Sequence, residues 1–517
     1  MAAVYEVAGV RASQDASGGR YGRTATSFYV ASAAAVLDNG GGLYGCRSPF
    51  EEIRNNVSAS KRSRDTWSSG LIFGLVLTGA TAGFGNFWRF PYLVGEHGGG
   101  AFLLVYLLCL LALGVPLLAA EILVGRRGRG SPVAAVARLS LQEGLWPSWR
   151  ALGWLCLLSC CLLLATLSVV GGWALAYVFR AASGAFAELD ALQAADLFQQ
   201  LIRDPERLLA WHTLFLGFAM MVVARGVRWG LEEAAHWFVP MLFGLLLLLV
   251  GYTAAASGQS SDALRHMLWP RLGALGWESL LLAMRHAIYT LSLGLGVALT
   301  LGAYLDERVS ILKASLLVAI ADTALGILAG LMVFPVLFGA ALLSSSGPEL
   351  VFQAIPLALG QLPSGTWFGT LFFLLLVFAA WTSAIALLEP LVAYLMERRG
   401  LERPHATSYA GIVAWSLGVV ALLSLSLWAH VRPLGRLDGF AESTLFDIMA
   451  FVAADLFLPV SSLALALLVG WRMSARSAEL ELGSGVGFRI WLVLIRYVVP
   501  LGLLVVLADG LGLFGFA

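Results

Sequence analysis

Several oxygen-bearing side chains lie inside long apolar stretches of this sequence. Asn86 belongs to the run GFGNFWRFPY at 83–92, Asp322 lies within a second apolar stretch, and Thr382 and Ser383 lie within a third. Amide, carboxylate and hydroxyl oxygens are hard ligands of the kind that Na⁺ binds. A carboxylate in such a stretch predicts a functional site, because an unpaired charge there is costly. The two hydroxyls have a simpler alternative role, which is hydrogen bonding to the backbone of their own helix.

These stretches belong to a chain that is apolar overall. Its 517 residues are 59% hydrophobic and 13% charged, with a mean hydropathy of +0.82, whereas soluble domains are about 45–50% apolar. This composition predicts an all-α protein that spans a membrane many times. The net charge of +1 gives no indication of a nucleic-acid partner. The five cysteines show neither a disulfide framework nor the spacing of a metal site.

Apolar runs of about 20 residues predict eleven membrane crossings. The runs lie at 68–94, 100–125, 150–182, 208–226, 234–256, 277–305, 311–341, 365–396, 407–429, 444–471 and 489–512. Basic clusters lie in alternate loops, at Lys61, Arg62 and Arg64, at Arg126, Arg127 and Arg129, at Arg225 and Arg228, at Arg398 and Arg399, and at Arg472 and Arg476. The positive-inside rule therefore predicts a multi-pass protein of the inner (plasma) membrane with a cytoplasmic N-terminus and an external C-terminus.

Residues 1–63 differ from the rest of the chain. They are rich in Ala, Ser and Gly and contain no long apolar run. We expect this segment to be a mobile cytoplasmic tail, because such a composition offers little apolar surface to bury. A segment that binds a partner is the alternative.

Glycines interrupt the first apolar run. Gly79, Gly83 and Gly85 permit the backbone to leave helical geometry. A break exposes carbonyl oxygens that can bind a cation and N–H groups that can face an anion. Broken helix at membrane depth occurs only inside the protein or beside a water-filled cavity, so the break predicts a binding site. The alternative is a glycine-packed crossing with a kink at Pro91.

The sixth apolar run is interrupted in the same way. Ser292, Gly294 and Gly296 lie within YTLSLGLG at 289–296. The two interrupted runs stand five crossings apart. This spacing predicts a transporter built from inverted five-helix repeats, with its site at the repeat interface.

Four motifs connect these features to a known family: GNFWRFPYLVGEHGGGAF at 85–102, TLSLGLG at 290–296, TSAIALLEP at 382–390 and LFDIMAF at 445–451. With them, the chain from about Arg64 onward resembles a neurotransmitter:sodium symporter of the bacterial leucine-transporter type. The resemblance implies a transporter and not an enzyme. It also implies a leucine-transporter-like (LeuT) fold, whose first and sixth helices are unwound in mid-membrane. The expected repeats are 64–256 and 277–471, followed by an eleventh helix and the C-terminus at 489–517.

The resemblance further implies two sodium sites beside the breaks. The first would be formed by the carbonyl of Thr81, the amide of Asn86, the hydroxyl and carbonyl of Thr290 and the carboxylate of Asp322. The second would be formed by the carbonyls of Gly79, Ala82 and Ala379 and the hydroxyls of Thr382 and Ser383.

Chloride is the other ion associated with this family. Many animal members use chloride to supply a negative charge near the first sodium site. Here Asp322 supplies such a charge, and Gly326 offers no hydroxyl one turn later. We therefore expect transport without chloride.

Four residues match the family's inner gate. Arg64 and Trp67 precede the first crossing, Tyr304 ends the sixth, and Glu397 ends the eighth. The resemblance implies that an Arg64–Glu397 ion pair closes the cytoplasmic side. The alternative is that the two charges are unrelated loop residues.

The outer side departs from the family pattern. Leu167 stands where amino-acid transporters of the family place a tyrosine hydroxyl on the substrate carboxylate. Ala450 stands where the family has an acid that pairs with the residue at Arg89. Asp447 is retained, and we expect it to pair with Arg89 or with Arg285 instead.

The expected substrate pocket is small and mostly apolar. Its residues are Gly83, Phe84, Gly85, Leu163, Leu167, Tyr289, Leu295 and Leu387, with Ser292 and Ser383 on the polar side. Gly83 stands where monoamine carriers of the family place Asp. The pocket therefore favours a zwitterion or a neutral solute over an amine that has no carboxylate.

Three functional interpretations follow. In the first, the protein is a sodium-coupled, alternating-access symporter that imports an amino acid, with Tyr289 lending its hydroxyl and Asp447 its charge. In the second, the solute differs, and its anionic group is absent or is bound by Arg89, Arg285 and the half-helix N-termini. In the third, the protein is a non-transporting sensor or scaffold, which the complete sodium ligand sets argue against. We expect a monomer or homodimer in the lipid bilayer, with a small-molecule substrate and no nucleic acid.

An intramembrane enzyme is the remaining class. His286 is the residue that suggests an enzyme, but no paired metal ligand or nucleophile motif accompanies this histidine. We expect His286 to make a hydrogen bond in the outer vestibule.

Overall fold

The computed structural model describes residues 66–187, 189–340, 347–436 and 439–513. Helices are the only regular elements in these ranges, apart from an isolated bridge between Gly99 and Pro270. The predicted all-α class is therefore confirmed. The expected Arg64 gate residue and the tail at 1–63 lie outside the described residues.

The first five expected crossings correspond to five helical stretches. They are α3 (Gly70–Thr81) with the short turn η2 (Phe84–Asn86) and α4 (Arg89–Glu96); α5 (Gly100–Cys109), η3 (Leu110–Gly114) and α6 (Val115–Gly128); α8 (Arg150–Ala182); α10 (Pro205–Ala224); and η5 (Val227–Glu232) with α11 (Glu233–Ala256).

The remaining crossings correspond to the second half of the chain. They are α13 (Trp277–Thr290) and α14 (Val297–Gly302); α15 (Ile311–Ala340); α18 (Gly365–Arg399); α19 (Arg403–Leu425); α20 (Leu445–Phe451), η8 (Val452–Phe457), α21 (Leu458–Leu467) and η9 (Leu468–Arg472); and α23 (Val486–Val493), η10 (Leu494–Val498) and α24 (Val499–Gly510). The connecting helices are α7 (Pro132–Gln142), η4 (Pro147–Trp149), α9 (Ala191–Ile202), α12 (Ser260–Leu268), η6 (Leu272–Ala274), α16 (Gly347–Glu349), η7 (Leu350–Ala354), α17 (Ile355–Gly360) and α22 (Ala475–Leu482).

Nine helical stretches of the described chain are long and apolar enough to cross a membrane, and a bent pair, Gly70–Thr81 with Phe84–Glu96, raises the number to ten. The one expected crossing that this count leaves out, 277–305, consists of α13 with 14 residues and α14 with 6 residues. Neither helix alone reaches the roughly 20 residues that a bilayer requires. The count of eleven and the repeat boundaries stay predictions.

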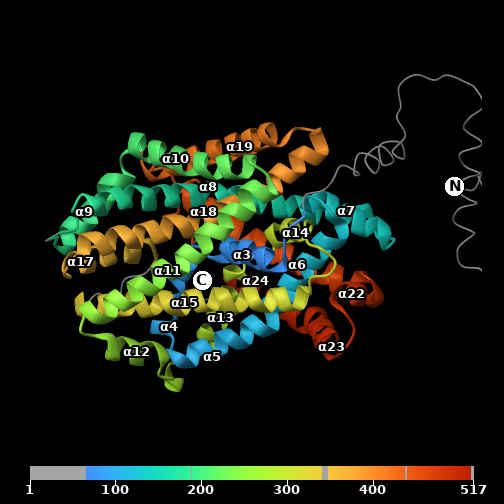
Figure 1. Cartoon of the computed structure of the whole chain (residues 1–517), viewed down its shortest axis with the longest axis horizontal. Coiled ribbons are helices and arrows are strands. Elements are labelled where there is room, and N and C mark those ends of the chain that lie inside the picture. Colours follow the sequence, from blue (N-terminus) through green and yellow to red (C-terminus); the bar gives the residue numbers. More distant parts are fainter. Residues whose placement is uncertain (1–65, 188, 341–346, 437–438, 514–517) are drawn as a thin grey trace, which may run out of the picture. The chain divides into compact units, whose positions relative to one another are not determined.

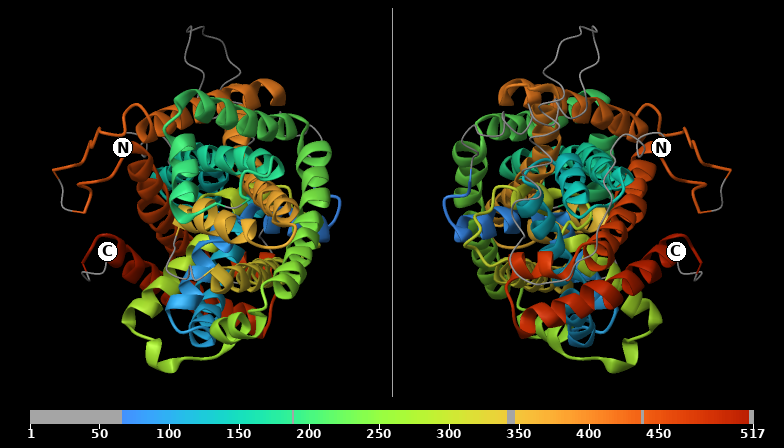
Figure 2. Two further views of the ribbon diagram at one scale, coloured as in Figure 1. Left: turned by 90° about the vertical axis from the view of Figure 1, so that its left-hand side faces the viewer. Right: turned by 90° about the vertical axis from the view of Figure 1, so that its right-hand side faces the viewer.

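The two longest helices lie together at the centre of the packing. α8 has 33 residues and α18 has 35, and apolar residues occur all around both, as expected for helices buried among others. α10 and α19 pack on each other and cover α8 (Figure 1). Many of the long helices run roughly along the horizontal of Figure 1 and are seen nearly end-on in Figure 2.

Both glycine-rich segments interrupt their helices. The axis bends by 72° between α3 and the stretch that begins at Phe84. Between α13 and α14, Ser292 has φ +53°, Gly294 +77° and Gly296 +75°. Left-handed backbone is uncommon for a serine and costs free energy that the surrounding packing must supply. The depth of these breaks in a bilayer stays a prediction.

Candidate functional site

Three residues of the first expected sodium site meet in the structure. Asn86 lies in η2, Thr290 ends α13, and Asp322 lies within α15. The Asn86 Nδ2 donates to Asp322 Oδ1 at 3.0 Å, and the Thr290 hydroxyl donates to Asp322 Oδ2 at 2.7 Å. Both carboxylate oxygens are thus oriented by residues from the two helix breaks.

The electrostatics of this cluster favour a cation. Asp322 is only 1% exposed, and no basic side chain within the described ranges forms an ion pair with it. Burying an unpaired carboxylate is costly. Because the Asn86 nitrogen faces the carboxylate, its amide oxygen remains available as a ligand. Thr81, the fourth expected contributor, is also buried, and its hydroxyl donates to the Thr78 carbonyl at 3.0 Å.

The second expected sodium site joins α3 to α18. A Cβ placed on Gly79 would lie 3.1 Å from the Cβ of Thr382, so the two backbones approach closely there. The Thr382 hydroxyl donates to the Ala379 carbonyl at 2.9 Å, which is the alternative role considered above. Ser383 is 5% exposed, and its hydroxyl has no partner among the described residues. Ala82 and Ala379 are buried beside these groups.

A bound ion would explain why the buried Ser383 hydroxyl has no hydrogen-bond partner among the described residues. Buried polar groups are normally hydrogen-bonded, and an exception calls for an unseen water or ion. The unpartnered Ser383 Oγ and the oxygen-only chemistry of both sets therefore fit Na⁺. The residues present are consistent with the two ligand sets expected from the sequence.

The second helix break is held by an acid that the sequence analysis missed. Glu121, buried in α6, accepts a hydrogen bond from the Gly294 N–H. The Ser461 hydroxyl donates to the Gly294 carbonyl at 2.5 Å. The available signal was a glutamate inside the apolar run 100–125.

The structure brings some of the expected pocket residues together. A Cβ on Gly83 would lie 3.9 Å from the Ser383 hydroxyl, and one on Gly85 would lie 3.5 Å from the Tyr289 ring. Phe84 is buried and stacks on Trp88 with ring centroids 5.0 Å apart. Leu295 and Leu387 are buried, whereas Leu163 and Leu167 are partly exposed. Ser292 lies in the break itself.

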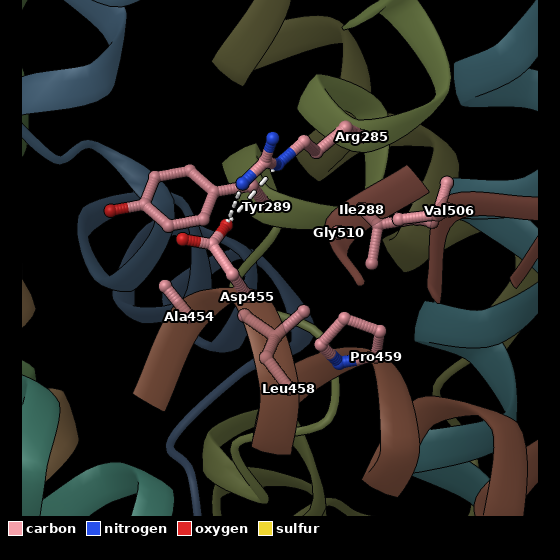
Figure 3. A pocket seen from close by; sticks show the side chains of 9 residues that line it. All are labelled: Arg285, Ile288, Tyr289, Ala454, Asp455, Leu458, Pro459, Val506 and Gly510. Atoms are coloured by element: carbon pink, nitrogen blue, oxygen red, sulfur yellow. Dashed lines mark hydrogen bonds and ion pairs between the residues drawn. The ribbon is translucent and has the colours of Figure 1, made fainter. Parts of the chain in front are cut away.

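Near the residues of the expected outer gate, the structure contains an ion pair that differs from the expected one. Arg285 forms an ion pair with Asp455 of η8 (Figure 3). The Arg89 guanidinium lies over the Tyr289 ring, 5.2 Å from its centroid. The expected pairing of Asp447 with either arginine is not present among the described residues. The Asp447 carboxylate instead accepts a hydrogen bond from the Thr444 hydroxyl at 2.7 Å and caps α20.

His286 occupies a buried position and not an outer vestibule. It is 1% exposed and lies against the rings of Phe90 and Tyr106, each with a centroid distance of 5.4 Å. Within the described residues its two ring nitrogens have no hydrogen-bond partner. A Cβ on Gly326 would lie 2.7 Å from the Phe90 ring, so this ring fills the space beside Gly326.

The expected inner-gate residues Trp67 and Tyr304 lie beside a second acid that the sequence did not indicate. Trp67 donates through Nε1 to the Leu301 carbonyl at 2.8 Å, and its ring meets that of Tyr304 edge to face at 5.8 Å. The Tyr304 hydroxyl donates to Glu389 at 2.8 Å, and Arg403 pairs with the same carboxylate.

Glu397, the acid expected at the inner gate, has other partners here. It accepts hydrogen bonds from the Ser131 hydroxyl at 2.7 Å and from the Ser131 N–H at 3.1 Å. Arg138 lies 3.6 Å from it in an ion pair. The expected Arg64–Glu397 pair cannot be compared, because Arg64 lies outside the described residues.

Comparison with known proteins gives this geometry a context. The chain is 32% identical over 455 residues to the uncharacterized sodium-dependent transporter YhdH of Bacillus subtilis, covering 87% of this chain and 98% of that protein. It is 29% identical over 466 residues to an uncharacterized sodium-dependent transporter of Haemophilus influenzae, covering 88% and 100%. The crystal structure of MhsT in complex with L-phenylalanine matches with a TM-score of 0.77 and 33% identity, over 87% of this chain and 100% of MhsT.

The match to MhsT confirms the predicted leucine-transporter-like fold. Residues 64–190 and 193–511 also match a single family, so the similarity covers nearly all of the chain outside its N-terminal segment. The chain belongs to the sodium:neurotransmitter symporter family.

Proposed function

We propose that this protein is a sodium-coupled symporter that imports a small organic solute by alternating access and needs no chloride. The observation that carries the proposal is Asp322, a buried carboxylate without a basic partner in the described chain, held by Asn86 and Thr290 from both helix breaks. A cation bound there would neutralise the buried charge and would fix the geometry of both breaks.

Two sodium sites agree best with the residues present. Asp322, Asn86, Thr290 and the Thr81 carbonyl would form the first, and Thr382, Ser383 and the carbonyls of Gly79, Ala82 and Ala379 the second. Two charges moving inward would each release about 2.3 kcal/mol per 100 mV of membrane potential. This energy can drive the uptake of a solute against its gradient.

An amino acid is the substrate class that we favour. MhsT, to which this chain is similar over most of its length, has been solved with L-phenylalanine. Gly83 leaves the pocket without an acidic counter-ion for a bare amine. The Arg89 guanidinium has no carboxylate partner in the described residues and stacks on Tyr289. It is therefore free to take the substrate carboxylate that Leu167 cannot bind.

The inner contacts suggest how the cytoplasmic side is held shut. Trp67 donates a hydrogen bond to the Leu301 carbonyl, and Tyr304 donates one to Glu389; both residues lie at ends of the two broken helices. Glu389 is fully buried and is paired with Arg403. These contacts must separate before the site can open to the cytoplasm, so they would oppose inward opening until substrate and sodium are bound.

A solute other than an amino acid is the second candidate. The observation that favours it is Leu167, which cannot donate a hydrogen bond to a carboxylate. A sensor or scaffold is less well supported, because such a role does not require the oriented carboxylate at Asp322.

The test is thermal stabilisation of the purified protein by a panel of amino acids, betaines and small amines, in sodium and in potassium. Stabilisation by an amino acid only in sodium is the expected result. Stabilisation by a solute without a carboxylate would replace the amino-acid proposal. Sodium coupling would be overturned if the unfolding temperature in sodium equals that in potassium for the intact protein as well as for Asp322→Asn.

A further inference from the structure

We propose that the ion pair between Arg285 and Asp455 is the outer gate of this transporter. The proposal rests on the transport function proposed above. The Nε of Arg285 lies 3.1 Å from Asp455 Oδ1, and Nη2 donates to the same oxygen (Figure 3). The side chains are 25% and 22% exposed, so the pair stands at the border between solvent and the protein interior.

The two residues belong to helices with mostly different neighbours. α13, which carries Arg285, packs mainly on α5 and η3. η8, which carries Asp455, packs on α8, α20 and α21, and α24 contacts both α13 and η8. α13 also ends at the second helix break, where the backbone can change direction. A movement of α13 relative to α8 therefore separates the two charges, as a gate requires.

A local feature of the helix explains how Asp455 reaches this position. Asp455 lies in η8, a π-helical stretch at Val452–Phe457. Five steps of a regular α-helix would place Asp455 about 140° around the axis from Ala450. A complete π-bulge adds one residue and reduces such an angle by about 100°. Asp455 lies within the π turn, so its carboxylate is turned part of the way back toward the face where Ala450 offers none.

Arg89 is not part of this pair. Its guanidinium lies over the Tyr289 ring, whereas the Tyr289 hydroxyl points away from the Arg285–Asp455 pair in Figure 3. With the gate assigned to Arg285, Arg89 forms no ion pair with a carboxylate of the described residues. The two arginines therefore have separate tasks, one in closing the outer side and one in facing the solute.

The space beside the pair is small. The cavity bounded by Arg285, Tyr289, Asp455, Pro459 and Gly510 has a volume of about 10 Å³, which is the room that roughly one water needs. The space beside the closed pair therefore holds no solute larger than water.

The test measures how fast a membrane-impermeant thiol reagent reaches a cysteine in the cavity beside the pair. Ile288 lines the same cavity and is 1% exposed. Ile288→Cys is made in a chain whose native cysteines are replaced, and labelling is followed in sodium plus substrate and in potassium. We then add Asp455→Asn, Arg285→Gln, or the exchange of Arg285→Asp with Asp455→Arg. Glu442→Gln is the matched control, because it removes a carboxylate from a different ion pair, with Arg432.

We expect Asp455→Asn and Arg285→Gln each to speed labelling about fivefold, in line with the loss of one partly exposed ion pair. The exchanged pair should restore protection, and Glu442→Gln should leave the rate unchanged. Unchanged labelling in both single variants, with sodium still stabilising the protein, would overturn the gate and leave the transport proposal intact. If the variants are labelled faster but sodium does not stabilise the protein, the ion pair is a barrier as proposed and sodium coupling is contradicted. Each variant is first checked for monodisperse elution, and Asp455→Ser or Arg285→Met replaces a single variant that fails at the same position.

Discussion

Asn86 and Asp322 are 236 positions apart in the chain, yet the amide nitrogen of one lies 3.0 Å from a carboxylate oxygen of the other. The same nitrogen also donates to the Asp322 carbonyl at 3.3 Å. Thr290 bonds the second carboxylate oxygen. One buried charge thereby connects both helix breaks, and changes at any of these residues should affect sodium binding and the fold of the breaks together.

Asn86→Ala should abolish sodium-coupled uptake while the protein remains folded. The change removes an expected ligand and leaves one Asp322 oxygen without its donor, which costs about 1–3 kcal/mol of stability. Uptake and unfolding temperature, each in sodium and potassium, measure the two effects. Gln200→Ala removes an exposed side-chain amide as a control. Sodium-dependent uptake at the normal rate in Asn86→Ala would show that the assigned site is wrong.

Uptake should not depend on chloride, because Asp322 supplies the negative charge near the first site. Exchange of chloride for gluconate should leave the rate unchanged. Asp322→Asn should lower sodium affinity by more than the roughly 10–100-fold that follows the loss of a residue supporting a metal ligand, because Asp322 is itself an expected ligand. Chloride should not rescue this variant, since Gly326 offers no hydroxyl and the Phe90 ring fills the space. A chloride requirement in the unmodified protein would contradict the prediction.

Gly294→Ala should destabilise the protein strongly. Gly294 has φ +77°, and an added Cβ would lie 2.3 Å from the Leu458 carbonyl oxygen. Strain of this kind and the clash are expected to cost more than about 1 kcal/mol. Gly217→Ala is the matched control, because nothing lies within 4 Å of its added Cβ, and in a helix it should be neutral or stabilising by up to about 1 kcal/mol. Equal denaturation midpoints for Gly294→Ala and Gly217→Ala would contradict this prediction.

Glu389→Gln should destabilise the inner side more than Tyr304→Phe. The first change leaves Arg403 without its buried partner, which costs about 3–5 kcal/mol, whereas the second removes one hydrogen bond worth about 1 kcal/mol. Thermal unfolding gives the order. Because both residues share one network, the double variant should lose less than the sum of the single losses. Strict additivity would mean that Tyr304 and Glu389 act independently.

His266 predicts a pH dependence of stability. Burial and the neighbouring Arg271, whose Nη1 lies 3.1 Å from Nδ1, lower its pKa from 6.5, while Glu96 opposes this shift. The unfolded chain therefore binds this proton more readily than the folded protein. The contribution is fully present above pH 6.5 and is lost as the pH falls towards the lowered pKa. Unfolding temperatures between pH 8 and pH 5 should fall more steeply for the unmodified protein than for His266→Gln; parallel curves would exclude the effect.

Much of the fold could be predicted from the sequence. Long apolar runs specify helices that span a membrane, and the glycines at 79–85 and 294–296 mark the two breaks, because both signals are local in the chain. Asn86 and Asp322 stand out for the same reason, as oxygen-bearing residues among apolar neighbours, whereas Thr290 is indicated only by the resemblance to the family. Their role as ion ligands stays a prediction.

The tertiary structure decided which charged residues pair. The sequence predicts that Asp447 pairs with Arg89 or Arg285, but Arg285 binds Asp455, 170 positions away, and the Tyr304 hydroxyl contacts Glu389. Glu121 holds the Gly294 N–H across 173 positions. Such pairs depend on how each helix is rotated about its axis, and a single π-bulge in η8 is enough to change that rotation. Residue types therefore indicate which groups could bind an ion, whereas the packing of the helices determines which of them meet.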